Sequence, residues 1–239
     1  MRRYESSYFN SATPGQGYDE YLNARDNWLR TFNRRLDEAR PYITAGRVLD
    51  VGCGAGYFLE AASQRGFDPY GIDLSDFIVQ VAQKKFGDRI QQATLESAPF
   101  PAEHFDFITA FDTFEHIYDP LAFLESASRL LKPGGVMMIT TPDCESGLAR
   151  LSGRHWVSFK IPEHVFYWSP PTIRQAMKHR FKVLDMRSAA QYASMSFLVR
   201  RLFRIGTSPA PFLQPVLNIV SRINIYADNG SLTVFASRL

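Results

Sequence analysis

The sequence of 239 residues has only two cysteines, Cys53 and Cys144. Two cysteines supply neither a disulfide framework nor a set of zinc ligands, so we expect no metal site and a reducing compartment, the cytoplasm. No window of about 18 residues is both apolar and uncharged, and the first residues contain two arginines but no apolar signal-sequence core. The sequence therefore disfavours both membrane spanning and secretion.

The chain also has little net charge, +3, but this total hides two halves of opposite sign. Residues 1–143 carry 14 basic and 20 acidic side chains, whereas residues 144–239 carry 13 basic and 4 acidic ones. This asymmetry indicates an anionic partner for the second half, either an acceptor molecule or a surface. No nucleic-acid-binding module accompanies the charge, and aromatic residues are not interleaved with it, so we expect no nucleic-acid partner.

Short apolar segments alternate with amphipathic ones after a helix expected over residues 19–40. The pattern predicts strands at residues 47–51, 67–73, 89–94, 105–111 and 136–140. A helix is expected after the first strand, ending at about residue 65, another over 75–86 with Ser75 as N-cap, and a third over 120–131. The Lys-Pro-Gly-Gly segment at residues 132–135 is expected to break regular secondary structure between that helix and the next strand. This alternation predicts an α/β fold with a doubly wound, mainly parallel sheet covered by helices on both faces. Ligands of such sheets bind at the carboxyl ends of the strands.

The second part of the chain has a different pattern. We expect a short helix at residues 172–179 and strands at 181–187 and 231–237, with a helical insertion at about 189–230 between them. Within it, residues 195–205 form a basic amphipathic helix with Arg200, Arg201 and Arg204 on one face. Such a helix suits an anionic membrane surface or a lipid-linked substrate, and a solvated helix face is the alternative.

We therefore expect one domain with three parts. Residues 1–40 provide an N-terminal cap helix, residues 41–143 a cofactor-binding core, and residues 144–239 the acceptor side. The insertion and the cap helix are expected to cover the acceptor site.

Three alternate glycines, Gly52, Gly54 and Gly56, follow the first predicted strand. Without a Cβ they let the backbone turn sharply and lie directly against a ligand. Asp50 stands two residues before this loop, where a carboxylate would repel a pyrophosphate but attract an ammonium or a sulfonium. The loop is therefore predicted to bind a nucleoside-type ligand that carries positive charge.

Asp73 ends the second predicted strand, 21 residues after the first glycine, where a carboxylate can accept both ribose hydroxyls. A nicotinamide-dependent oxidoreductase is the alternative of this kind. Tyr57 stands where the dinucleotide-binding motif has its third glycine, which disfavours that alternative.

Five blocks of sequence occur in a characteristic order: VLDVGCGAG at 48–56, GID at 71–73, FDFI at 105–108, EHIYDP at 115–120 and LLKPGG at 130–135. In these blocks the chain resembles the class I S-adenosylmethionine-dependent methyltransferases. The resemblance covers about residues 45–190 and returns at the last strand. It implies a Rossmann-like sheet of seven strands with the last one antiparallel, and S-adenosylmethionine as the cofactor.

The resemblance also implies where the cofactor lies. The glycine loop would line its methionine and ribose, Asp73 would hold the ribose hydroxyls, Leu74 would flank the adenine, and Phe111 would lie beside the transferred methyl group. The full set implied to bind cofactor is Asp50, Gly52, Cys53, Gly54, Gly56, Tyr57, Phe58, Asp73, Leu74, Leu95, Glu96, Phe111 and Asp112.

Residues 141–143 (TPD), 155–156 (HW) and 162–169 (PEHVFYWS) narrow the resemblance to small bacterial methyltransferases related to the ubiquinone-biosynthesis O-methyltransferases and to enzymes acting on sugars and polyketides. The implied acceptor is a small molecule with a hydroxyl, on a sugar, phenol, quinol or polyketide-like metabolite. A hydroxyl acceptor needs a base, and histidine is the natural one near neutral pH. We expect His164 first and His116 second. The alternatives are a structural role for each histidine, and a non-catalytic protein that keeps the S-adenosylmethionine pocket.

Overall fold

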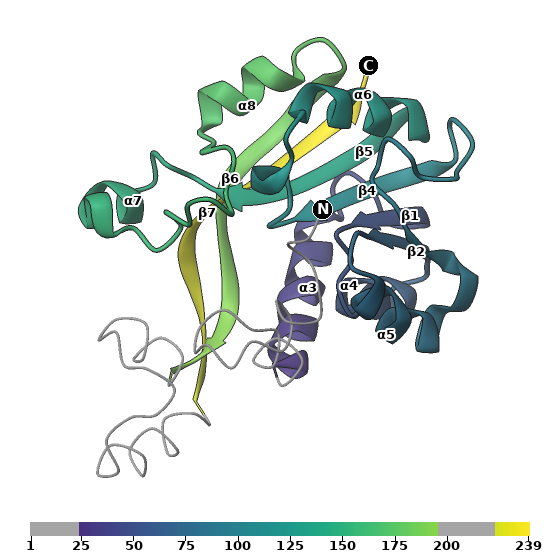
Figure 1. The fold of residues 1–239 in the computed structure, drawn as a ribbon, viewed down its shortest axis with the longest axis horizontal. Helices are drawn as coiled ribbons and strands as arrows, with labels where there is room; N and C mark the ends of the chain where they lie inside the picture. Colours follow the sequence, from purple (N-terminus) through teal and green to yellow (C-terminus); the bar gives the residue numbers. More distant parts are fainter. Residues whose placement is uncertain (1–23, 196–222) are drawn as a thin grey trace.

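The structure is a computed structural model that describes residues 24–195 and 223–239 (Figure 1), and strand β1 (Gly46–Val51) is an interior strand of its sheet. The side chains of β1 alternate between two hydrophobic cores, one containing Leu49 and Val51 and the other containing Val48. Both faces of the strand are covered, and this is why its sequence is an almost continuous apolar run.

The alternation of strands and helices confirms the predicted doubly wound α/β fold. The elements that follow β1 are α4 (Tyr57–Gln64), β2 (Phe67–Asp73), α5 (Asp76–Phe86), β3 (Ile90–Gln92), β4 (Phe105–Phe111), α6 (Pro120–Leu130), β5 (Leu131–Pro142), α7 (Gly147–Ser152), α8 (Pro170–Met177), β6 (Phe181–Ser194) and β7 (Asn224–Arg238). The sheet has seven strands in the order β3-β2-β1-β4-β5-β7-β6. Strand β7 runs antiparallel to both of its neighbours, as the resemblance implied.

Helices cover both faces of this sheet (Figure 1). On one face, Phe32 of α3 (Arg25–Ala39) and Phe58 of α4 belong to one buried cluster. On the other face, Phe123 of α6 and Ile173 of α8 belong to the second cluster. The two cores therefore hold the sheet between two helical layers, and its strand ends are left to form a site.

Two helices begin at the predicted positions with a side-chain cap, and Ser75 is the N-cap that the sequence predicted. The Ser75 hydroxyl accepts a hydrogen bond from the backbone N–H of Ile78, and the Asp119 carboxylate accepts one from that of Ala122. Pro120 occupies the first turn of α6, where its missing N–H costs nothing. These local signals fixed the helix starts because each depends on residues within one turn.

Two strand boundaries differ from the prediction. Strand β3 covers only Ile90–Gln92, shorter than the expected 89–94. Strand β5 begins at Leu131, so the expected break at residues 132–135 was wrong. Phe105 pairs with Leu131 and Phe107 pairs with Val136, and this register shift absorbs the extra residues as a bulge.

The predicted helical insertion was wrong at both of its ends. Residues 189–194 and 224–230 continue β6 and β7 as an antiparallel pair, from Ala190 opposite Asp228 to Ser194 opposite Asn224. We call this pair the β6–β7 arm. A register shift interrupts this pairing where Ala189 lies opposite Ser231 and Ala190 lies opposite Asp228. The basic segment 195–205, with Arg200, Arg201 and Arg204, lies outside the described residues except for Met195.

Contacts with α3 hold the β6–β7 arm. The Tyr192 backbone N–H donates to the Thr31 hydroxyl over 2.9 Å, and the Arg30 guanidinium lies 4.6 Å from the centre of the Tyr192 ring. The arm therefore depends on partners far away in the sequence, which strand periodicity cannot reveal.

Among the described helices, none is long and apolar enough to cross a membrane.

Candidate active site

A cavity of about 850 Å³ opens at the carboxyl ends of β1, β2 and β4. The strand order reverses between β1 and β4, and open parallel sheets bind ligands at such a point. The position expected from the strand pattern is therefore the position of the cavity.

The glycine loop forms one wall of the cavity. Gly52 has a φ of +73°, and a Cβ there would stand 2.5 Å from the Thr113 hydroxyl. The backbone N–H groups of Gly52 and Cys53 both donate to the carbonyl of Ile72, over 2.8 and 3.0 Å. These bonds fix the loop across the ends of β1 and β2, and only glycine fits at its first turn.

Asp73 joins the end of β2 to the glycine loop. Its carboxylate accepts hydrogen bonds from the backbone N–H of Gly54 and from that of Ser75, each over 3.0 Å. Burial raises the pKa of this carboxyl. Both oxygens keep a lone pair free, and the residue lines the cavity, so the carboxylate is placed to accept hydroxyl donors from a ligand.

Asp50 forms part of the cavity floor. It is 3% exposed, and its Oδ1 accepts a 2.7 Å hydrogen bond from the Thr109 hydroxyl. Burial raises the pKa of Asp50 to about 8. A cationic ligand in the cavity would favour the charged form of this carboxyl.

Most residues predicted to bind cofactor line this one cavity: Asp50, Gly52, Cys53, Gly54, Asp73, Leu74, Leu95, Glu96, Phe111 and Asp112. Three others do not. Gly56 is the N-cap of α4, where a Cβ would meet the Phe86 ring at 2.8 Å, and Tyr57 is mostly buried in the first turn of that helix. Phe58 is 1% exposed and packs edge-on against Phe111 in the core. These three residues do not line the cavity, so the structure does not support the prediction that they contact the cofactor directly.

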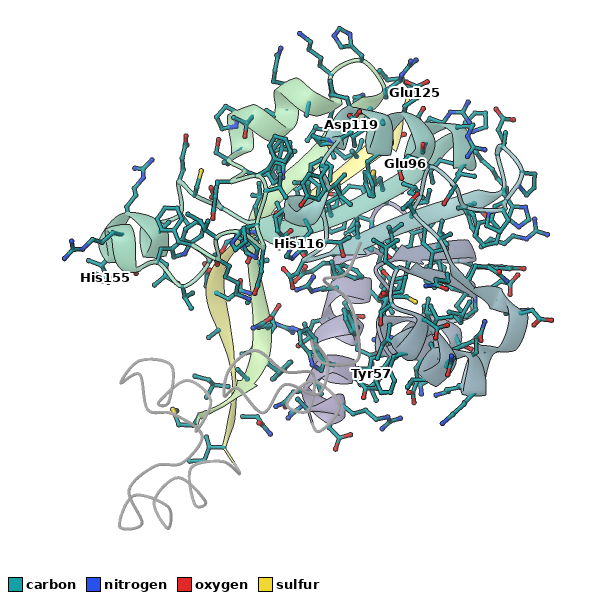
Figure 2. The ribbon with its side chains drawn as sticks, in the orientation of Figure 1. Tyr57, Glu96, His116, Asp119, Glu125 and His155 are labelled. Carbon is teal, nitrogen blue, oxygen red and sulfur yellow. The ribbon has the colours of Figure 1, made fainter. Side chains whose placement is uncertain are left out.

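The two histidines predicted as bases meet at the far side of the cavity. The rings of His116, which is labelled in Figure 2, and of His164 lie edge to face with their centres 4.8 Å apart. His116 is in the 3₁₀ helix η3 (Phe114–His116), and its Nδ1 donates to the backbone carbonyl of Glu163 over 2.9 Å. Because a carbonyl only accepts, the neutral ring of His116 keeps its lone pair on Nε2.

Glu115 completes this cluster and was missed as a functional residue. Its Oε2 accepts a 2.9 Å hydrogen bond from the Thr141 hydroxyl, and it is 2% exposed. Its backbone carbonyl accepts hydrogen bonds from the N–H groups of Val165 and Phe166, which holds His164 over η3. The adjacent Glu115-His116 pair in the sequence was the only signal that could have found it.

Burial controls the charge of the cluster. It lowers the pKa of His164 to about 4, with His116 and Lys160 adding to the effect, and it also lowers the pKa of His116. It raises the pKa of Glu115 to about 8, with Asp112 as the next cause. At neutral pH both imidazoles are therefore uncharged and can accept a proton.

Glu115, His116 and His164 could also hold a metal ion. One potential ligand atom of each lies within 4.8 Å of the others, and the Nδ1 of His164 is buried without a hydrogen-bond partner among the described residues. Neutral imidazoles and a carboxylate are ligands that divalent metals accept.

The outer walls of the cavity come from elements that the sequence placed only roughly. Trp28 and Phe32 of α3 line one side, as expected of a cap helix. The β6–β7 arm, the segment before α8, the end of β5 and Ser231 of β7 supply the rest: Pro142, Leu148, Val157, Ser158, Lys160, Gln191, Ala193, Ala227, Asp228, Asn229 and Ser231.

The lining is acidic. Its carboxylates are Asp50, Asp73, Glu96, Asp112, Glu115, Asp119 and Asp228, against a single lysine, Lys160, among the described residues. The expectation of an anionic acceptor therefore finds no support in the described lining, where Lys160 is the one basic residue from the second half of the chain.

Fold and site together define an α/β protein of the nucleoside-binding kind, in which a cluster of one glutamate and two histidines faces the same cavity as the glycine loop. A profile of the family described as "Methyltransferase domain" matches residues 18–181. The chain belongs to this family, and the resemblance to class I S-adenosylmethionine-dependent methyltransferases is confirmed.

Relatives and solved structures agree with this assignment. Ubiquinone biosynthesis O-methyltransferase of Leptothrix cholodnii is 31% identical over 147 residues, which are 58% of this chain and 60% of that protein. The same enzyme of Xanthomonas campestris is 37% identical over 116 residues, 45% and 48% of the two chains. The chain thus matches about half of the length of these relatives.

An S-adenosylmethionine-dependent methyltransferase of Thermotoga maritima, described as a possible histamine N-methyltransferase, has a TM-score of 0.60 at 20% identity, covering 92% of this chain and 93% of its own. Geranyl diphosphate C-methyltransferase of Streptomyces coelicolor has a TM-score of 0.58 at 15% identity, covering 87% and 76%. At these identities the likeness shows the fold.

S-adenosylmethionine fits the cavity. The glycine loop has no room for a Cβ at Gly52, so its backbone can lie against the methionine and the ribose of the cofactor. The Asp73 carboxylate can accept hydrogen bonds from the ribose hydroxyls. The acidic lining suits a ligand that carries a sulfonium and an ammonium.

Proposed function

We propose that this chain transfers the methyl group of S-adenosylmethionine to a hydroxyl oxygen of a small-molecule acceptor. One observation carries the proposal: a single cavity joins the glycine loop and Asp73 at one end to the Glu115, His116 and His164 cluster at the other. The curated relatives are O-methyltransferases, which supports oxygen as the acceptor atom. The acceptor classes that we propose are sugars, phenols or quinols, and polyketide-like metabolites.

The bound cofactor supplies an electrophilic methyl group on a sulfonium. The chain's own residues hold it and the acceptor in line: the Asp73 carboxylate accepts the ribose hydroxyls, and Phe111 and Asp112 border the reacting end. The α3 helix and the β6–β7 arm exclude water from the cavity.

His164 receives the acceptor proton. As the oxygen–methyl bond forms and the sulfur–methyl bond breaks, the hydroxyl proton passes to a ring nitrogen of His164, and His116 is the second candidate. The pKa of His164 near 4 makes it a weak base that is always unprotonated at neutral pH. The proton then leaves His164 for water when the product departs, because the adjacent Glu115, whose pKa is raised to about 8, is itself protonated at neutral pH. We propose that this chemistry proceeds without a metal ion.

Titration calorimetry of the full chain with S-adenosylmethionine, S-adenosylhomocysteine and NAD tests the cofactor. Binding of the first two without NAD supports the proposal, whereas NAD binding without a response to either would favour an oxidoreductase. A screen for methyl transfer to phenols, quinol analogues and sugars tests the reaction. Cofactor binding with no transfer to any of them would favour a non-catalytic binding protein.

A further inference from the structure

The proposed reaction places negative charge on the acceptor oxygen. As the hydroxyl proton passes to His164, the oxygen becomes anionic until its bond to the methyl carbon forms and the sulfur leaves as a neutral thioether. An oxygen anion in a cavity shielded from water is stabilised by a positive charge or a hydrogen-bond donor held close to it. We therefore looked for such a group at the acceptor end of the cavity.

Lys160 is the cation at this end. Among the described residues it is the one lysine in the cavity lining, and no arginine lines the cavity. The residue is exposed, and none of the ion pairs in the described part of the chain involves it. Its ammonium hydrogens are therefore available to a ligand in the cavity.

The backbone holds Lys160 beside the predicted base. The Lys160 N–H donates to the carbonyl of Ser158 over 2.9 Å, and the Lys160 carbonyl accepts from the N–H of His164 over 2.8 Å. Ser158 and His164 are both buried, at 9% and 8% exposure, so the two ends of this turn are fixed in the protein. Both Lys160 and His164 line the cavity from the turn.

The charge of Lys160 also reaches the whole cluster. Burial is the largest influence on the pKa of Glu115, His116 and His164, and the Lys160 charge acts on all three groups. It opposes the raised pKa of Glu115 and adds to the lowered pKa of each histidine. Because the interaction between charges weakens with distance, the ammonium lies in the part of the cavity that the cluster faces.

Nearby carboxylates have other partners. The Glu115 Oε2 accepts a 2.9 Å hydrogen bond from the Thr141 hydroxyl. The Asp112 carboxylate is the nearest balance for the buried Arg35 guanidinium, whose pKa burial lowers and Asp112 raises. A structural ion pair therefore does not account for the position of Lys160.

We infer that Lys160 is a further catalytic residue, whose ammonium donates a hydrogen bond to the acceptor oxygen and stabilises the negative charge that develops there. The inference rests on the proposed function, but it concerns the charge on the oxygen rather than the removal of its proton. An acceptor that is neutral when it binds and anionic only during the reaction fits a lining with a single lysine.

4-Nitrophenol tests this role without methyl transfer, because its phenol and phenolate forms absorb at different wavelengths. The full chain is saturated with S-adenosylhomocysteine, and the bound probe is titrated with pH by absorbance. We expect the pKa of the bound probe to lie about 1 unit or more below that of the free probe, as beside any opposite charge. Lys160→Met should abolish the shift, and Lys160→Arg should keep most of it.

Transfer rates give a second readout. Lys160→Met should lower kcat by about 100-fold for weakly acidic phenols, and by less for 4-nitrophenol, whose oxygen needs less stabilisation. The affinity for S-adenosylmethionine in calorimetry should not change, since the glycine loop and Asp73 are intact. Lys178→Met, at the exposed C-cap of α8, is the matched control and should behave as the unaltered chain does.

Three results would overturn the inference. One is a bound probe with the same pKa in the unaltered chain and in Lys160→Met. Another is an equal loss of kcat for every phenol of the series, which indicates a structural role. The third is a complex with S-adenosylhomocysteine that binds no phenol. A shift that depends on Lys160, without transfer to any acceptor, would support the role of Lys160 and count against the proposed function, so the two can fail separately.

Discussion

Arg35 of α3 donates a hydrogen bond from Nη1 to the hydroxyl of Thr140 on β5 over 2.6 Å, across 105 positions of sequence. Arg35 is 2% exposed, and burial lowers the pKa of its guanidinium, with the Asp112 carboxylate as the main opposing influence. The guanidinium also lies 4.8 Å from the centre of the Phe111 ring. The buried Arg35 side chain thus links the cap helix α3 to β5 through Thr140 and to β4 through Phe111.

Removing either partner should destabilise the protein. Thr140→Val leaves the Arg35 Nη1 without this acceptor, and we expect a loss of about 1–3 kcal/mol in the free energy of unfolding, measured by urea denaturation. Arg35→Met should cost a similar amount, and the double variant less than the sum, because the two residues share one interaction. Arg40→Met, at an exposed position in the same part of the chain, is the control. Strictly additive effects would contradict the coupling.

Asp73→Asn should weaken S-adenosylmethionine binding by about 10- to 30-fold in titration calorimetry. The carboxylate accepts from two backbone N–H groups and still offers lone pairs to ribose hydroxyls, whereas an amide replaces one acceptor by a donor. Asp88→Asn, at an exposed position in the 3₁₀ helix Gly87–Arg89, should bind as the unaltered chain does. Equal affinity in the Asp73 variant would remove this residue from the cofactor site.

His164→Gln should lower kcat for methyl transfer by about 100-fold or more while leaving cofactor affinity unchanged, as expected for loss of a base. His116→Gln should have a smaller effect, since its Nδ1 is engaged with the Glu163 carbonyl. Single-turnover rates over a range of pH separate this from a structural role. A defect that disappears at high pH, where hydroxide replaces the base, supports catalysis, and a pH-independent defect contradicts it.

Glu115→Gln should change how stability depends on pH. A carboxyl whose folded pKa, about 8, lies above its ordinary value of 4.5 binds more protons when folded, so its stability is full below 4.5 and is lost as pH rises towards 8. We expect the variant to match the unaltered protein near pH 4.5 and to be more stable by roughly 1–4 kcal/mol at pH 8. Denaturation at both pH values, with Glu145→Gln as the exposed control, measures this. A variant that is less stable at pH 8 would show that Glu115 is charged in the fold.

Chelation with EDTA should leave methyl transfer unchanged, because we propose that the cluster works as a neutral acid–base group. Activity that is lost and then restored by a divalent ion would instead assign Glu115, His116 and His164 to a metal site. In that case His164→Gln should also lower the affinity for the ion, measured by calorimetry.

Prediction from the sequence succeeded where the signal was local. The N-cap at Ser75, the helix start at Pro120 and the extent of β4 depend on neighbours within a few residues, and all three agree with the prediction. It failed at β5, where a bulge absorbed a Pro-Gly-Gly segment, and in the β6–β7 arm. Both outcomes were decided by pairing with strands distant in sequence.

The sequence by itself determined the doubly wound sheet and the cofactor end of the cavity, because the glycine loop and Asp73 lie at the ends of consecutive strands, where local geometry places them together. Only the tertiary structure decided the acceptor end. Glu115 and His116 meet His164 because the Glu115 carbonyl binds the backbone N–H groups of Val165 and Phe166. That contact joins residues 50 and 51 positions apart, and it depends on the path of the chain rather than on any local preference.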